Sequence, residues 1–224
     1  MTDDRIRVEQ TVTAWRRIET WLEEYAPRSH RRLPPPASEE EIRTVERELD
    51  LVIPADVRAF YRIHNGTGPD VDFEWSTWDG PLPIPEDAWD PEQDPSGYIL
   101  PEGGIGPLEK VTYWFDGPAG YEREEEPQQR YLAFVASDPD GLYGLFADCT
   151  PGEGYGGLGS YAEADVPTPG PWPSFAAYLT AVADALHDGR GVGTDTDVPG
   201  VLHQSLHWDD PRSPSAQAWA PIRG

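Results

Sequence analysis

Residues 38–66 read SEEEIRTVERELDLVIPADVRAFYRIHNG and contain the start and stop signals of two helices. Ser38 begins the first helix, and Glu41, three residues further on, is its capping-box partner. Pro54 stands at a plausible first position of the second helix, where a missing N–H costs nothing. Asn65-Gly66 ends that helix, because both residues tolerate the left-handed conformation that a helix C-terminus needs. The stretch therefore predicts two short helices joined by a turn.

Two further helices are predicted at the ends of the chain. Apolar side chains recur every three or four residues between Arg5 and Tyr25, which is the period of one helix face, and Pro27 follows. A basic, proline-rich linker is expected from Arg28 to Pro36. Ser174 caps a last helix that ends at Gly189.

Strand-like segments occupy the middle of the chain, at Val111–Phe115, Tyr131–Ala136 and Leu142–Asp148. The last two flank the turn sequence SDPDG (137–141), in which Pro sets φ and Gly permits positive φ, so they predict a hairpin. Helices followed by strands and a final helix predict an α+β fold, with helices packed against a mostly antiparallel β-sheet.

Three segments are expected along the chain. Residues 1–35 hold the N-terminal helix and the linker, residues 36–189 form the main domain, and residues 190–224 form a tail rich in Gly, Asp and Pro. We expect this tail to pack loosely, anchored by Leu206, Trp208 or Trp219.

The charge of the 224-residue chain is strongly and unevenly negative. It has 17 basic and 41 acidic residues, a balance of −24. Residues 1–66 hold 11 basic and 13 acidic side chains, and residues 67–224 hold 6 and 28, a balance of −22. Such a field repels nucleic acid and anionic membranes and attracts basic partners, although plain solvation of an acidic surface explains it as well. No apolar run reaches the length of about 18 residues that a membrane span needs, and no signal peptide is evident, so a cytoplasmic protein is expected.

Residues that could carry chemistry have structural explanations. The sequence GYGGLG (154–159) matches a dinucleotide fingerprint, but three prolines follow before any helix can start, so a loop is expected. Cys149 follows an apolar strand and is expected to be a buried small hydrophobe. His203 and His207 could share a metal only if the tail were helical, and His64 is expected to stand at a helix end. No enzyme, cofactor or metal site is predicted.

The helical stretch resembles the signature of the SUKH superfamily, the Smi/Knr-like proteins. The resemblance rests on the acidic helix from Glu39, the turn Leu49-Asp50-Leu51-Val52-Ile53-Pro54, the aromatic pair Phe60-Tyr61 and the closing Asn65-Gly66. Trp15 to Leu22 is similar to the opening helix of these domains, and Ser174 to Leu179 is similar to their closing helix. Asp50 stands where glycine is usual, a mild departure because Asp tolerates a left-handed turn. The resemblance implies a single α+β domain without catalysis.

The resemblance and the charge together lead to a functional expectation. Many bacterial members of the superfamily are immunity proteins that neutralise toxins, often nucleases, whereas fungal relatives regulate cell-wall synthesis. An immunity protein for a basic toxin is therefore the first expectation. A regulatory or scaffolding module that binds a host protein is the alternative, and a carbohydrate-binding protein is the third.

The docking site for the partner is predicted in the segment from Asp70 to Asp94, within a stretch between Thr67 and Glu102 that has ten acidic and no basic residues. Tryptophan is frequent in interface hot spots, and carboxylates set association rate and specificity. The predicted partner-binding residues are Asp70, Asp72, Glu74, Trp75, Trp78, Asp79, Asp87, Trp89 and Asp90. Glu124, Glu125 and Glu126 offer a second acidic edge. The other interpretation places Trp75 and Trp78 in the core, with the acids only solvating a loop.

Overall fold

The computed structural model describes residues 2–68, 96–116, 130–163, 165–212 and 220–221. The helices are α1 (Thr2–Tyr25), α2 (Pro27–Arg32), α3 (Glu39–Glu48), α4 (Ala55–Tyr61), α5 (Leu108–Asp116) and α7 (Phe175–Asp188). The strands are β1 (Gly104–Ile105), β2 (Tyr131–Ala136), β3 (Tyr143–Asp148), β4 (Leu158–Ala162), β5 (Thr168–Pro169), β6 (Val198–Leu202), β7 (Ser205–Asp209) and β8 (Ala220–Pro221).

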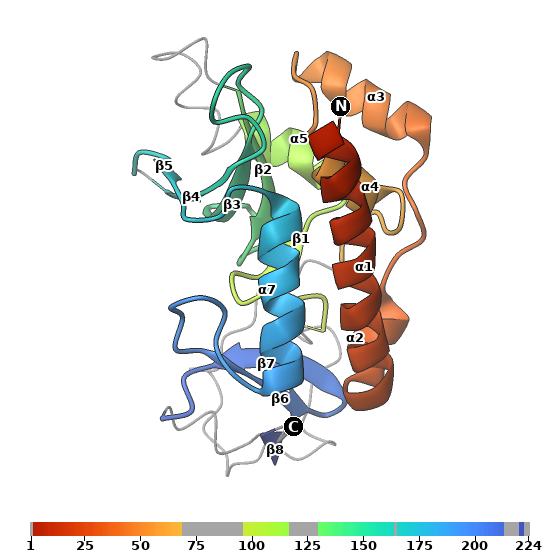
Figure 1. The fold of residues 1–224 in the computed structure, drawn as a ribbon, viewed down its shortest axis with the longest axis vertical. Helices are drawn as coiled ribbons and strands as arrows, with labels where there is room; N and C mark the ends of the chain where they lie inside the picture. Colours follow the sequence, from red (N-terminus) through yellow and green to blue (C-terminus); the bar gives the residue numbers. More distant parts are fainter. Residues whose placement is uncertain (1, 69–95, 117–129, 164, 213–219, 222–224) are drawn as a thin grey trace.

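The strands form two antiparallel sheets, of order β1-β2-β3-β4-β5 and β7-β6-β8. Helices α1 and α7 lie side by side, with α7 between α1 and the larger sheet, and the smaller sheet lies near the C-terminal ends of both helices (Figure 1). The predicted α+β fold, with helices packed against a mostly antiparallel sheet, is confirmed.

The signals in residues 38–66 act as the sequence predicts. The N–H of Ser38 donates to Glu41 Oε2 at 2.7 Å and the N–H of Glu41 donates to Ser38 Oγ at 3.2 Å, which completes the capping box. Asp50 adopts φ +49°, the left-handed conformation expected of it. Pro54 is the N-cap of α4 rather than its first residue, and the helix ends at Tyr61, before Asn65-Gly66.

A row of aromatic rings connects the helices to the sheet. The ring centroids of Trp15 in α1 and Phe60 in α4 lie 4.8 Å apart, and those of Phe60 and Phe175 in α7 lie 5.9 Å apart. Phe175 in turn lies 5.1 Å from Phe134 in β2. All three contacts are edge-to-face, the geometry that the ring quadrupoles favour. The core thus joins segments more than 100 residues apart in the chain.

The predicted hairpin is confirmed, with β2 and β3 paired antiparallel around the turn at residues 137–141. The carboxylate of Asp138 accepts the N–H groups of Asp140, Leu142 and Tyr143 at 3.0–3.1 Å. Gly141 has φ +68° as predicted, and a Cβ there would lie 2.1 Å from the ring of Trp114. The turn therefore needs glycine for both its conformation and its close contact.

The expected strand at Val111–Phe115 is wrong, because these residues belong to helix α5. Leu108, Val111 and Trp114 are buried on one side of the helix, whereas Tyr113 is 60% exposed. The side chain of Asn65 accepts the N–H of Leu108 at 2.9 Å, so a residue distant in sequence caps the helix. This contact overrides the strand preference of a β-branched and aromatic segment.

The expected linker and the expected tail both contain regular structure. The proline-rich linker contains helix α2, whose Ser29 is buried and accepts the N–H of Leu206 at 3.0 Å. The tail is not loosely packed between residues 198 and 209, where β6 and β7 form a hairpin. The anchors Leu206 and Trp208 are confirmed, because Leu206 is fully buried and Trp208 Nε1 donates to Ile99 O at 3.1 Å. Trp219 lies outside the described residues.

His64 connects the opening helix to the segment before α3. Its Nδ1 hydrogen bonds to the carbonyl oxygen of Pro34, and its Nε2 lies 3.1 Å from Glu19 Oε1. Both partners can only accept, so the doubly protonated imidazolium satisfies both contacts. Burial lowers the pKa of His64, but the hydrogen bonds to Glu19 and Pro34 raise it more, and the net pKa lies above its ordinary value.

This contact predicts a pH-dependent stability. Because the folded-state pKa of His64 is raised, its contribution is fully present below the unfolded pKa of about 6.5 and is lost as pH rises through the folded pKa. We expect Glu19→Gln to lower the free energy of unfolding more at about pH 5 than at about pH 8. Denaturant unfolding of both proteins across this range measures the difference. An equal loss at both pH values contradicts the assignment.

Candidate protein-interaction surface

The partner-binding residues predicted from Asp70 to Asp90 lie outside the described residues, in the range 69–95. Glu124, Glu125 and Glu126 lie in the second such range, 117–129. Both assignments stay predictions. The structure describes the residues that flank the longer segment, 67–68 and 96–97, and these are called its base.

That base is fixed by the fully buried Thr67. Its N–H donates to Ile105 O at 2.9 Å, its hydroxyl donates to Gly97 O, and the N–H of Ile105 donates to its Oγ1 at 3.0 Å. A Cβ on Gly68 would lie only 3.4 Å from the Cα of Gly97. The described residues on the two sides of the acidic segment therefore lie side by side, next to strand β1.

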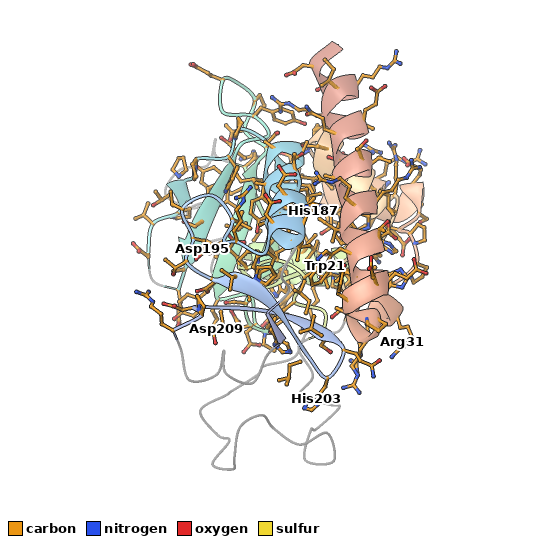
Figure 2. All side chains as sticks on the ribbon, turned by 60° about the horizontal axis from the view of Figure 1, so that its bottom comes forward. Trp21, Arg31, His187, Asp195, His203 and Asp209 are labelled. Carbon is orange, nitrogen blue, oxygen red and sulfur yellow. The ribbon has the colours of Figure 1, made fainter. Side chains whose placement is uncertain are left out.

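A hollow of about 480 Å³ is lined by residues from five separate parts of the chain, and three of them supply the side chains that matter here. Glu102 comes from the segment after the base, Trp172 from the approach to α7, and Asp195 from the loop between α7 and β6. Figure 2 shows Asp195 on the sheet side of α7, whereas the labelled Trp21 lies on the α1 side. The sequence analysis missed all three of these residues.

Glu102 is mostly buried in this hollow and accepts a hydrogen bond from the Tyr178 hydroxyl. Burial raises the pKa of the Glu102 carboxyl and the nearby Asp195 raises it further, against the lowering effect of Tyr178. Neither acid forms an ion pair with any residue that the structure describes. The carboxyl group of Glu102 is therefore desolvated, and no described cation lies at ion-pair distance from it.

Trp172 forms the wall between this hollow and a neighbouring one. Its ring lies 5.6 Å from that of Tyr178 in an edge-to-face arrangement. The second hollow, of about 460 Å³, also contains Asp148, Glu153 and Arg7. The two hollows share Trp172 and together are lined by four carboxylates and one arginine, a combination of acids and tryptophan like that predicted for residues 70–90.

A larger groove of about 1110 Å³ is rich in arginine instead. Four arginines line it, from α3, from α4 and from the position just before β2. These arginines are held by acids of the same region. Arg58 lies 3.0 Å from Glu46 and 3.1 Å from Glu39, and Arg130 lies 3.4 Å from Asp50. The groove is therefore largely a network of internal ion pairs.

The prediction that Cys149 is buried is confirmed. The residue lines this groove. Burial raises the pKa of its thiol, chiefly by desolvation, so the reactive thiolate is disfavoured. The glycine-rich sequence 154–159 leads into strand β4 and not into a helix, which removes the context that a dinucleotide site requires.

The helical condition for a metal pair at His203 and His207 is not met, because His203 lies in the turn of the β6–β7 hairpin and His207 lies on β7. Within the described ranges there is no group of three or more His, Cys, Asp or Glu side chains that could hold a metal ion. A search of the same ranges finds no helix with the length and apolar character needed to cross a membrane.

The architecture defines an α+β domain whose helices pack against an antiparallel sheet. Residues 36–181 match the profile of the SMI1 / KNR4 family (SUKH-1), and the chain belongs to this family. It is 34% identical over 59 residues to the KNR4/SMI1 homolog of Kluyveromyces lactis, a match covering 26% of this chain and 11% of that protein. It is 32% identical over 65 residues to the cell wall assembly regulator SMI1 of Saccharomyces cerevisiae, covering 29% of this chain and 13% of that protein. The matches thus span only a small part of these curated relatives.

Proposed function

We propose that this chain is a non-enzymatic, cytoplasmic immunity protein that binds a basic toxin domain of the nuclease type. The observation that carries the proposal is the balance of −22 over residues 67–224, in a family that includes immunity proteins. A nuclease holds its substrate in a positively charged cleft, and an inhibitor that occupies this cleft is expected to be acidic. The carboxylates around Trp172 supply part of such a surface on the described residues.

The test is binding and rescue with the product of the gene adjacent to its own. We expect the purified chain to retain that product in a pull-down, and co-expression to restore growth of a bacterial host that the product poisons. An unrelated acidic protein of similar net charge serves as the control, because charge alone should not rescue. Failure of both binding and rescue contradicts the proposal.

A regulatory or scaffolding module that binds a host protein is the second candidate. It is favoured by the names of the two fungal relatives, one of which is a cell wall assembly regulator. This alternative predicts no adjacent toxin gene and no rescue of poisoned cells. The rescue assay therefore separates the two candidates.

A further inference from the structure

The hollow around Trp172 differs in charge from the other described hollows. Its lining contains Glu102 and Asp195 but no lysine, arginine or histidine. The neighbouring hollow and the larger groove described above each include at least one arginine. A cation from outside would therefore meet no like charge among the described residues of the lining.

We propose that this hollow receives an arginine side chain of the bound partner, with the guanidinium group between Glu102 and Asp195 and against the ring of Trp172. The inference rests on the proposed function in that it gives the basic partner a specific docking residue. It concerns only described residues and does not depend on the predicted site at residues 70–90.

The two acids have hydrogen-bond acceptors available for a guanidinium group. One oxygen of Glu102 accepts the Tyr178 hydroxyl, and Asp195 Oδ1 accepts the N–H of Asp197 at 3.1 Å. A carboxylate has about four lone-pair positions, so both acids retain acceptor capacity. Arginine presents five donors in a planar fork that also stacks on aromatic faces, whereas lysine is a point charge with three donors.

The position of the aromatic ring is also fixed. Trp172 is held edge-to-face against the buried Tyr178, and a Cβ on Gly193 would lie 3.2 Å from its ring. Gly193 has φ +61°, so a larger residue there would be strained as well as crowded. A ring presented in this way can make a cation–π contact with a guanidinium group. The hollow, at about 480 Å³, lies in the range of typical ligand pockets, about 300–1,000 Å³.

The burial of the Glu102 carboxyl group favours binding of a cation in the hollow. Burial raises the pKa of Glu102, so the ionised carboxylate is less favourable in the folded protein than in the unfolded chain, and no described residue lies at ion-pair distance to act as its counter-ion. A bound guanidinium group supplies that counter-ion. Glu102→Gln is therefore expected to leave the melting temperature of the free protein unchanged or higher while weakening cation binding.

The experiment titrates the full chain with N-acetyl-arginine amide and follows the indole N–H signal of Trp172 by NMR. The signal is assigned by its loss in Trp172→Phe. N-acetyl-citrulline amide is the matched control ligand, because citrulline has nearly the same shape without the charge. We expect a saturable shift with the arginine ligand and at least about tenfold weaker binding of the citrulline ligand, since charged hydrogen-bond partners are the stronger ones.

Matched variants locate the site. Glu102→Gln and Asp195→Asn should each weaken binding of the arginine ligand by about fivefold or more, whereas Glu163→Gln, at an exposed position outside the hollow, should not. Equal binding of arginine and citrulline, or no loss in both hollow variants when their melting temperatures are retained, overturns the proposal. A broad response to neutral oligosaccharides at Trp172 in place of arginine also overturns it.

The outcome is separable from that of the proposed function. If the chain rescues poisoned cells but the arginine ligand does not bind, only the docking assignment is wrong. If the arginine ligand binds but no rescue occurs, the hollow remains a cation site and the immunity function is wrong.

Discussion

Phe60→Ala is expected to lower the free energy of unfolding by about 3–5 kcal/mol, the range measured for removing a buried aromatic ring. Phe60 is fully buried and its ring contacts those of Trp15, Tyr61 and Phe175. Its removal leaves a cavity where α1, α4 and α7 meet, and it also removes three edge-to-face contacts. Denaturant unfolding measures the loss.

Tyr113→Ala is the matched control, because Tyr113 is also an aromatic residue in a helix but its side chain is 60% exposed. Its replacement is expected to change stability by no more than about 0.5 kcal/mol. A cost of less than about 1 kcal/mol for Phe60→Ala contradicts the described core.

Asp56→Ala is expected to cost about 3 kcal/mol, because two buried N–H groups lose their acceptor and each such loss costs about 1–3 kcal/mol. Asp56 is fully buried in the first turn of α4. Its Oδ1 accepts the N–H of Val57 and its Oδ2 accepts the N–H of Ala176, both at 3.1 Å. Ala176 lies in the first turn of α7, so one carboxylate serves the N-termini of two helices, where negative charge is favoured.

Two replacements check this account. Asp56→Asn keeps one acceptor oxygen and should cost less than Asp56→Ala, while Asp140→Ala at an exposed position should change stability by no more than about 0.5 kcal/mol. If Asp56→Ala were no more costly than Asp140→Ala, the connection between α4 and α7 would be wrong.

The elements predicted correctly are those whose signals are local in sequence. The capping box of Ser38 and Glu41, the left-handed Asp50 and the turn at Asp138 each act within a few residues of themselves. Such contacts form from neighbouring residues whatever the rest of the chain does. The family signature in residues 39–66 is likewise short and contiguous, which explains why it could be recognised from one sequence.

The elements predicted wrongly depend on contacts from distant parts of the chain. Helix α5 receives its cap from Asn65, which is 43 residues away from Leu108. The β6–β7 hairpin turns at His203 and Gln204, which have φ +48° and +68°, where the sequence signal for such a turn is Asn-Gly. Neither feature leaves a local pattern in the sequence.

The same reason applies to the hollow at Trp172. Glu102, Trp172 and Asp195 come from three segments that only the folded chain brings together. Trp172 lies in a segment rich in proline and glycine, for which the sequence suggested no binding role. The sequence could indicate an acidic domain of this family, but it could not indicate where carboxylates and an aromatic ring share a cavity.

The central claim is that an acidic surface captures a basic partner, and the salt dependence of the dissociation constant tests it most directly. The constant for the adjacent gene product is measured between about 50 and 500 mM salt, because charge steering is screened within about 10 Å at 0.1 M. We predict at least about tenfold weaker binding at the high end, and slower association when Asp72, Asp79 and Asp90 are all replaced by asparagine. A dissociation constant that does not change with salt would contradict the claim.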